Sequence, residues 1–149
     1  MERYKALREH MRDLERKMRL LESYPEWHNI SLTQFHAIAE IGRAKTLSLI
    51  QLAGVLGLDT STVSRTVDGL VKAQLVNREN DPSNRRYISI SLSKDGKKVF
   101  RDIETSMNQQ YRRILQLIPK EKQGAVIGSI KIIISAINSS ALEAESGAK

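Results

Sequence analysis

The sequence has no cysteine among its 149 residues. This absence excludes disulfide bonds, thiolate metal ligands, iron–sulfur clusters, cysteine nucleophiles and thiol redox sensors. Long apolar runs are also missing, because even Ile132–Ile134 is far shorter than the roughly 20 residues that a membrane span needs. The N-terminal residues Met1–Lys5 contain charges and no apolar signal core. We therefore expect a cytoplasmic protein without a membrane partner.

Reactive groups are sparse as well. The three histidines, at positions 10, 28 and 36, are scattered, and the acidic residues form no close cluster of the kind that a catalytic metal site needs. No glycine-rich phosphate loop is present, and no nucleophile stands beside a candidate base. The sequence predicts that the protein is not an enzyme and needs no metal or cofactor.

A basic bias is the first positive feature. Lys and Arg number 24 against 17 Asp and Glu, which gives a net charge of +7. Residues 43–98 alone carry 10 basic and 5 acidic side chains. A basic balance in one segment suggests a polyanionic partner, although a solvated surface with a mild basic bias explains the charge alone equally well.

The two ends of the chain have apolar seams. Leu7, Met11, Leu14 and Met18 repeat at alternating spacings of four and three residues, which is typical of a coiled-coil helix. This seam is too narrow to form the face of a globular core, so it predicts packing against another chain or a second long helix. After Pro119, a last helix places apolar residues on one face, among them Ile130, Ile133, Ile134 and Ile137. Residues from Ser139 to Lys149 are small and polar and indicate a frayed tail.

The middle of the chain predicts a compact order of elements. A capping box at Ser31 begins a helix that we expect to stop at Gly42. A helix over 47–57, a tight turn over 57–59 and a helix over 60–74 follow. The apolar period then changes from 3.6 to 2 over 75–78 and 87–92, which predicts a hairpin with a turn-rich linker at 81–86. A long helix should run from Ser93 to Ile118. This mainly α chain with a small β-hairpin is a winged helix-turn-helix.

The helix over 60–74 has two predicted faces. Val63, Val67, Leu70 and Val71 should point into the core. The outward residues that we expect at a DNA major groove are Ser61, Thr62, Ser64, Arg65 and Lys72. Short hydroxyl side chains let a helix approach the groove closely, and an arginine can donate two hydrogen bonds to a guanine edge. An ordinary surface helix with a good N-cap is the alternative for this segment taken alone.

The predicted hairpin tip carries Arg85 and Arg86, which suit a narrow minor groove. Asp81 can pair with one of the two guanidinium groups and hold it. A solvated, charged turn is the alternative interpretation of the same residues.

Residues 47–97 closely resemble the multiple-antibiotic-resistance regulator (MarR) family of transcription factors, and the flanking long helices extend the resemblance over nearly the whole chain. The matching segments are Leu52–Gly57, Ser61–Arg65, Leu70–Val76, Asp81–Arg86 and Leu92–Gly96. The family's wing often reads Asp-x-Arg-Asp-x-Arg, whereas Ser83 and Asn84 stand at its third and fourth positions here.

The resemblance implies a homodimer that binds a palindromic operator in double-stranded DNA. It divides the chain into helical dimerisation regions at 1–30 and 99–149 and a DNA-binding domain at 31–98. It also implies a small aromatic or acidic ligand, which we place near Trp27, His28 and His36. Trp27 has a simpler alternative role as a plug between two helices. The expected function is a repressor released by its ligand, and the alternative is a non-catalytic module in which the winged domain docks onto protein.

Overall fold

The computed structural model describes residues 2–21 and 29–147. It forms two compact units, Met1–Ile103 and Glu104–Lys149, each of which is described by itself. The elements in chain order are α1 (Arg3–Leu21), α2 (Leu32–Ala44), β1 (Thr46–Ser48), α3 (Leu49–Leu56), α4 (Thr60–Lys72), β2 (Val76–Asp81), β3 (Asn84–Leu92), α5 (Lys94–Gln116) and α6 (Lys120–Ser146). The predicted fold class, mainly helical with a small sheet, is confirmed.

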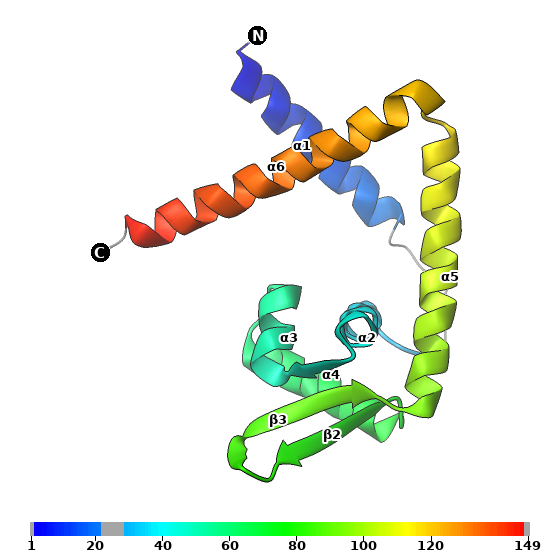
Figure 1. Ribbon diagram of the computed structural model, residues 1–149, viewed down its shortest axis with the longest axis vertical. Coiled ribbons are helices and arrows are strands. Elements are labelled where there is room, and N and C mark those ends of the chain that lie inside the picture. Colours follow the sequence, from blue (N-terminus) through cyan, green and yellow to red (C-terminus); the bar gives the residue numbers. More distant parts are fainter. Residues whose placement is uncertain (1, 22–28, 148–149) are drawn as a thin grey trace. The chain divides into compact units, whose positions relative to one another are not determined.

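The sheet has three strands, in the order β1-β3-β2, and both pairings are antiparallel. Figure 1 shows β2 and β3 projecting as a hairpin from the helices α2 to α4. The sequence-based expectation of a helix beginning at residue 47 was wrong, because Thr46–Ser48 pairs with Ser89–Ser91 of β3. Leu47 fits the apolar spacing of the following helix, but its backbone bonds to a strand more than 40 residues away in the chain.

The core of the first unit lies between α2, α3, α4 and β3, which pack against one another. Ile38, Ile41, Leu52, Leu70 and Ile90 are fully buried there. Burying each such side chain contributes roughly 1.5–3 kcal/mol relative to leaving it in water. This core holds α4 and the hairpin on one rigid domain.

Local caps fix where the helices begin and end. Ser31 and Gln34 form the predicted capping box of α2, and Ser48 and Gln51 form a second one at α3 that we did not predict. Gly57 ends α3 in the left-handed conformation, as expected. Helix α2 continues past Gly42 to Ala44, so the predicted stop was wrong.

The residue after α2 is unusual. Lys45 has φ 70° and ψ −48°, a positive-φ conformation that side-chain-bearing residues rarely adopt. Such a conformation costs a non-glycine residue on the order of 1–3 kcal/mol. The surrounding pairing of β1 with β3 begins at the next residue and holds this turn in place.

The long outer helices expose apolar side chains within the chain itself. No residue of α1 or α6 is buried, and Leu7, Leu14, Ile130, Ile134 and Ile137 are each about half exposed. Met11, Met18 and Ile133 are partly covered. Helix α6 extends to Ser146, so the expectation of a frayed tail from Ser139 was wrong.

Among the described residues, α6 is the one helix that is long and apolar enough to cross a membrane by length and composition. This test is weak evidence, because helices that bury an apolar face against protein can also pass it. Lys131 stands in the middle of the apolar stretch, where a charged side chain is costly in a bilayer.

Candidate nucleic-acid interface

The start of α4 is capped by Asp59. Its carboxylate accepts hydrogen bonds from the backbone N–H of Thr62 (2.9 Å) and from the Thr62 hydroxyl (2.6 Å). These bonds, the hydroxyl bond first, lower the pKa of Asp59 below its usual 3.8, and the positive charge of Arg65 contributes a smaller lowering. The cap keeps the first turn of α4 ordered with its hydroxyl side chains at the surface.

The two predicted faces of α4 are largely present in the structure. Val63, Val67 and Leu70 are fully buried, which fixes the helix against the core. Val71 is 37% exposed, so its prediction as a core residue was wrong. It lies one residue beyond the buried stripe, where the helix end turns toward solvent.

The polar residues predicted to read DNA divide into two groups. Ser61, Arg65 and Lys72 are exposed, whereas Thr62 and Ser64 are half-buried. The hydroxyl of Thr62 donates to Asp59, so this residue stabilises the helix start in the unbound protein. Arg65 makes no salt bridge with any residue that the structure describes, and its guanidinium remains available to a partner.

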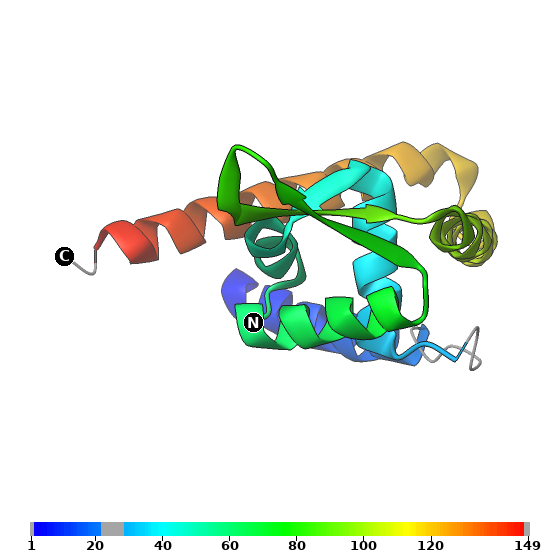
Figure 2. The same cartoon turned by 90° about the horizontal axis from the view of Figure 1, so that it is seen from below.

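An ion pair connects α4 to the hairpin. Nη1 of Arg78, on β2, lies 2.6 Å from Oδ1 of Asp68, on the exposed side of α4. Sequence reasoning missed Arg78 because the pairing depends on how the strand lies beside the helix. The pair sets the position of the hairpin relative to α4, and Figure 2 looks at these two elements from below.

The hairpin is longer than predicted. Residues 81–86 were expected to form a linker, but β2 continues to Asp81 and β3 begins at Asn84, so only Pro82 and Ser83 form the turn. A register shift lies between Asn80 and Asp81. Apolar alternation cannot signal these outer strand residues, because both faces of a projecting hairpin meet solvent. Arg85 and Arg86 are therefore strand residues by backbone, and their side chains, like that of Asp81, lie outside the described part.

The start of α5 is joined to the end of α4. The Ser93 hydroxyl accepts a hydrogen bond from the N–H of Gly96 (2.9 Å) and donates one to the carbonyl of Gln74 (2.7 Å). Gly96 lies so close to the carbonyl of Leu75 that no side chain fits there. The helix that follows the wing is thus fixed to the DNA-facing helix through backbone contacts.

The residues predicted to bind a ligand receive a partial placement. Trp27 and His28 lie outside the described residues. His36 is half-buried on α2, where its ring meets that of Phe35 edge-on at 5.5 Å between centroids. Within residues 2–21 and 29–147, no group of three or more His, Cys, Asp or Glu residues could hold a metal ion.

Comparisons with known proteins agree on one family. Residues 30–88 match the sequence model of the MarR family. A helix-turn-helix transcriptional regulator of Bacillus subtilis, YfiV, is 25% identical over 120 residues, which cover 79% of this chain and 75% of YfiV. The multiple antibiotic resistance protein MarR of Salmonella typhimurium is 29% identical over 82 residues, or 55% of this chain and 57% of that protein.

Solved structures share the fold. FabT of Streptococcus pneumoniae in complex with DNA aligns with a TM-score of 0.78 at 17% identity, covering 91% of this chain and 98% of FabT. A mutant MarR of Escherichia coli complexed with operator DNA aligns with a TM-score of 0.65 at 22% identity, covering 83% and 89% of the two chains.

Proposed function

The chain belongs to the MarR family of winged-helix transcriptional regulators, and we propose that it is a dimeric repressor that reads a palindromic operator and leaves it when a small ligand binds. The observation that carries the DNA-binding part is the division of α4 into a fully buried apolar face and an exposed face with Arg65 free of salt bridges among the described residues. Members of this family are transcriptional regulators and not enzymes.

In the proposed complex, α4 enters the major groove and the hairpin reaches the adjacent minor groove. Ser61, Thr62, Ser64 and Arg65 are proposed to contact base edges or nearby phosphates, and Lys72 a phosphate. Arg85 and Arg86 are proposed to enter the minor groove, with Asp81 holding one of them. The structures of FabT and MarR bound to DNA support a protein of this fold at a duplex.

The half-exposed apolar residues of α1 and α6 support a dimer. Leu7, Leu14, Ile130, Ile134 and Ile137 are too exposed within one chain for a stable surface in water. A second copy covering them places two α4 helices in one particle, and a two-fold axis then demands a palindromic operator. The two recognition helices must lie about 34 Å apart to enter successive major grooves.

Release is proposed to depend on a small aromatic or acidic molecule near Trp27, His28 and His36, because a thiol switch is excluded by composition. A ligand shifts the dimer away from DNA only by as much as it prefers the incompetent state. An aromatic carboxylate should lower operator affinity and quench Trp27 fluorescence, while hydrogen peroxide should leave operator affinity unchanged. If a broad panel of aromatic carboxylates changes neither signal, control by protein abundance becomes the better account.

The DNA proposal is tested by selecting bound sequences from random DNA, followed by gel shifts over a range of salt concentrations. A selected palindrome whose affinity falls steeply with salt supports the proposal, because phosphate contacts release counterions. A protein-docking module would select no sequence and would show no retention on heparin.

A further inference from the structure

A groove of about 720 Å³ lies on the winged domain, at a place that the DNA proposal does not use. The end of α2, all three strands and the first turns of α5 line it. None of the lining residues belongs to the sets predicted to contact DNA or ligand. Its volume falls within the range of roughly 300–1,000 Å³ that is usual for small-molecule sites.

The charged side chains of this groove all have one sign. Lys45, Lys97 and Arg101 line it, and no aspartate or glutamate does. None of the three makes a salt bridge with a residue in the described part of the chain. Lys97 and Arg101 stand four residues apart on one face of α5, where like charges repel each other. An anion in the groove removes this repulsion.

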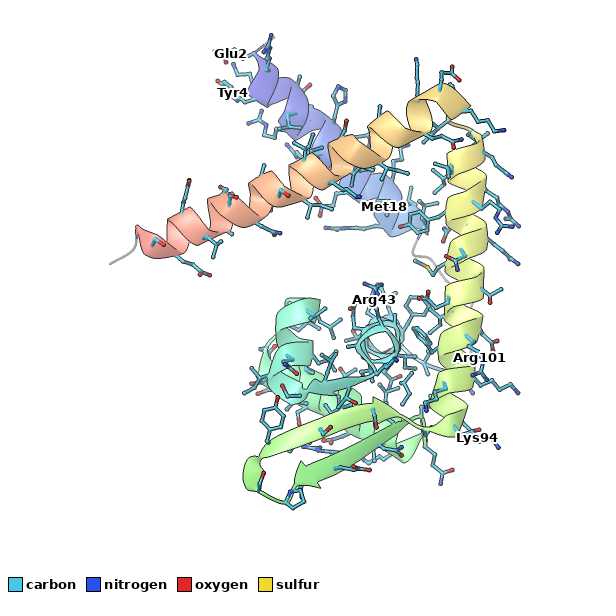
Figure 3. All side chains as sticks on the ribbon, in the orientation of Figure 1. Glu2, Tyr4, Met18, Arg43, Lys94 and Arg101 are labelled. Carbon is cyan, nitrogen blue, oxygen red and sulfur yellow. The ribbon has the colours of Figure 1, made fainter. Side chains whose placement is uncertain are left out.

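The positions of these cations are costly for the fold. Lys94, Lys97, Lys98 and Arg101 crowd the start of α5 beside a single acid, Asp95, although the positive end of a helix dipole disfavours cations. Figure 3 labels Lys94 and Arg101 on this part of α5. Lys45 holds a positive-φ backbone that glycine would adopt more easily. Stability explains neither choice, whereas recruitment of an anion explains both.

The rest of the lining has a polar part and an apolar part. Thr46, Ser91 and Asn77 form one row across the three strands, because Ser91 pairs with both of the others. They face away from the buried Ile90, since side chains alternate along a strand. Ile41 and Phe100 supply apolar surface, and Phe100 packs against Gly42, where a side chain would have no room.

We propose that this groove binds a small organic anion with a carboxylate head and an apolar body of a few carbon atoms. The carboxylate contacts Lys45, Lys97 and Arg101, with the hydroxyl of Thr46 or Ser91 as an additional donor. The body lies against Ile41 and Phe100. The site goes beyond DNA reading and is tested without DNA.

The test uses the full-length, nitrogen-15-labelled protein, titrated with benzoate and with its neutral analogue benzamide. Benzoate should shift the backbone amide signals of Thr46, Asn77 and Ser91, and benzamide should not. Lys97→Gln should weaken benzoate binding roughly tenfold, the usual loss for a charge-assisted hydrogen bond. Lys98→Gln is the matched control, because it removes the same charge from an exposed neighbour outside the groove.

Several results would overturn the proposal. These are the absence of shifts at millimolar benzoate, equal binding of benzamide, shifts confined to other parts of the protein, or equal losses in the two lysine variants. If Lys97→Gln instead weakens binding to all DNA sequences while benzoate does not bind, these cations contact phosphates. Both variants remove one cation from the same helix start, so a thermal melt should show similar stability and exclude misfolding as the cause of any difference.

Discussion

At the scale of single residues, Arg65 and Lys72 carry the same charge on the same helix, yet we expect them to act differently on DNA. Arg65→Ala should cost about 1–3 kcal/mol of operator binding and relax selection at one base position in each half-site, because a bidentate contact is lost. Lys72→Ala should weaken all sequences alike and reduce the salt slope by about one. Selection from random DNA checks both variants, and identical sequence profiles for wild type and Arg65→Ala would refute the assignment of Arg65.

Asp59 gives the start of α4 a dependence on pH. Its hydrogen bonds with Thr62 lower its folded pKa below 3.8, so its stabilising effect is complete above the unfolded value. The effect is lost as the pH falls through the folded pKa, because a protonated carboxyl is a weaker acceptor. Asp59→Asn keeps a capping side chain that does not titrate.

The measurement for Asp59 is the unfolding free energy of both proteins as a function of pH. Wild type should lose more stability than Asp59→Asn on acidification below about pH 4. The other carboxylates are common to both proteins and cancel in the comparison. Parallel curves would show that the cap does not depend on the charge of Asp59.

At the scale of elements, the ion pair between Asp68 and Arg78 connects α4 to β2. Both side chains are partly exposed, with 49% and 30% of their surfaces accessible, so solvent screens the pair. A double-mutant cycle with Asp68→Ala and Arg78→Ala should give a coupling of about 0.2–1 kcal/mol in urea denaturation.

The same pair should matter more for DNA selectivity than for stability. Without Asp68, Arg78 gains freedom to contact any phosphate, and the hairpin is no longer tied to α4. Asp68→Ala should therefore raise affinity for random DNA and lower the ratio between operator and random DNA. An unchanged ratio would mean that the core alone positions the hairpin.

At the scale of the whole molecule, the apolar side chains of α6 predict the oligomeric state. Ile130→Glu combined with Ile134→Glu should convert a dimer into a monomer, since each aliphatic chain buried at an interface contributes roughly 1.5–3 kcal/mol. Ile132→Glu is the matched control, because at 100° per residue it points away from this face. Sedimentation equilibrium at micromolar concentration measures the mass, and a monomeric wild type would contradict the dimer.

Much of the fold could be predicted because its signals are local. The capping box at Ser31, the left-handed Gly57 and the buried stripe of α4 each depend on residues within a few positions of one another. The capping box at Ser48 carries the same signal and was missed because the apolar spacing around it favours an uninterrupted helix. The DNA-contacting and ligand-contacting residues remain predictions.

The sequence by itself determined the helices, their exposed and buried faces, and the exclusion of thiol chemistry, since these follow from spacing, caps and composition. Only the tertiary structure decided that residues 46–48 form a strand, that Arg78 meets Asp68, and that three cations line one groove. Each of these depends on residues distant in the chain, or on a strand lying beside a helix. The register of β3 against β1 and β2 selects which side chains become neighbours, and that register is set by the packed core as a whole.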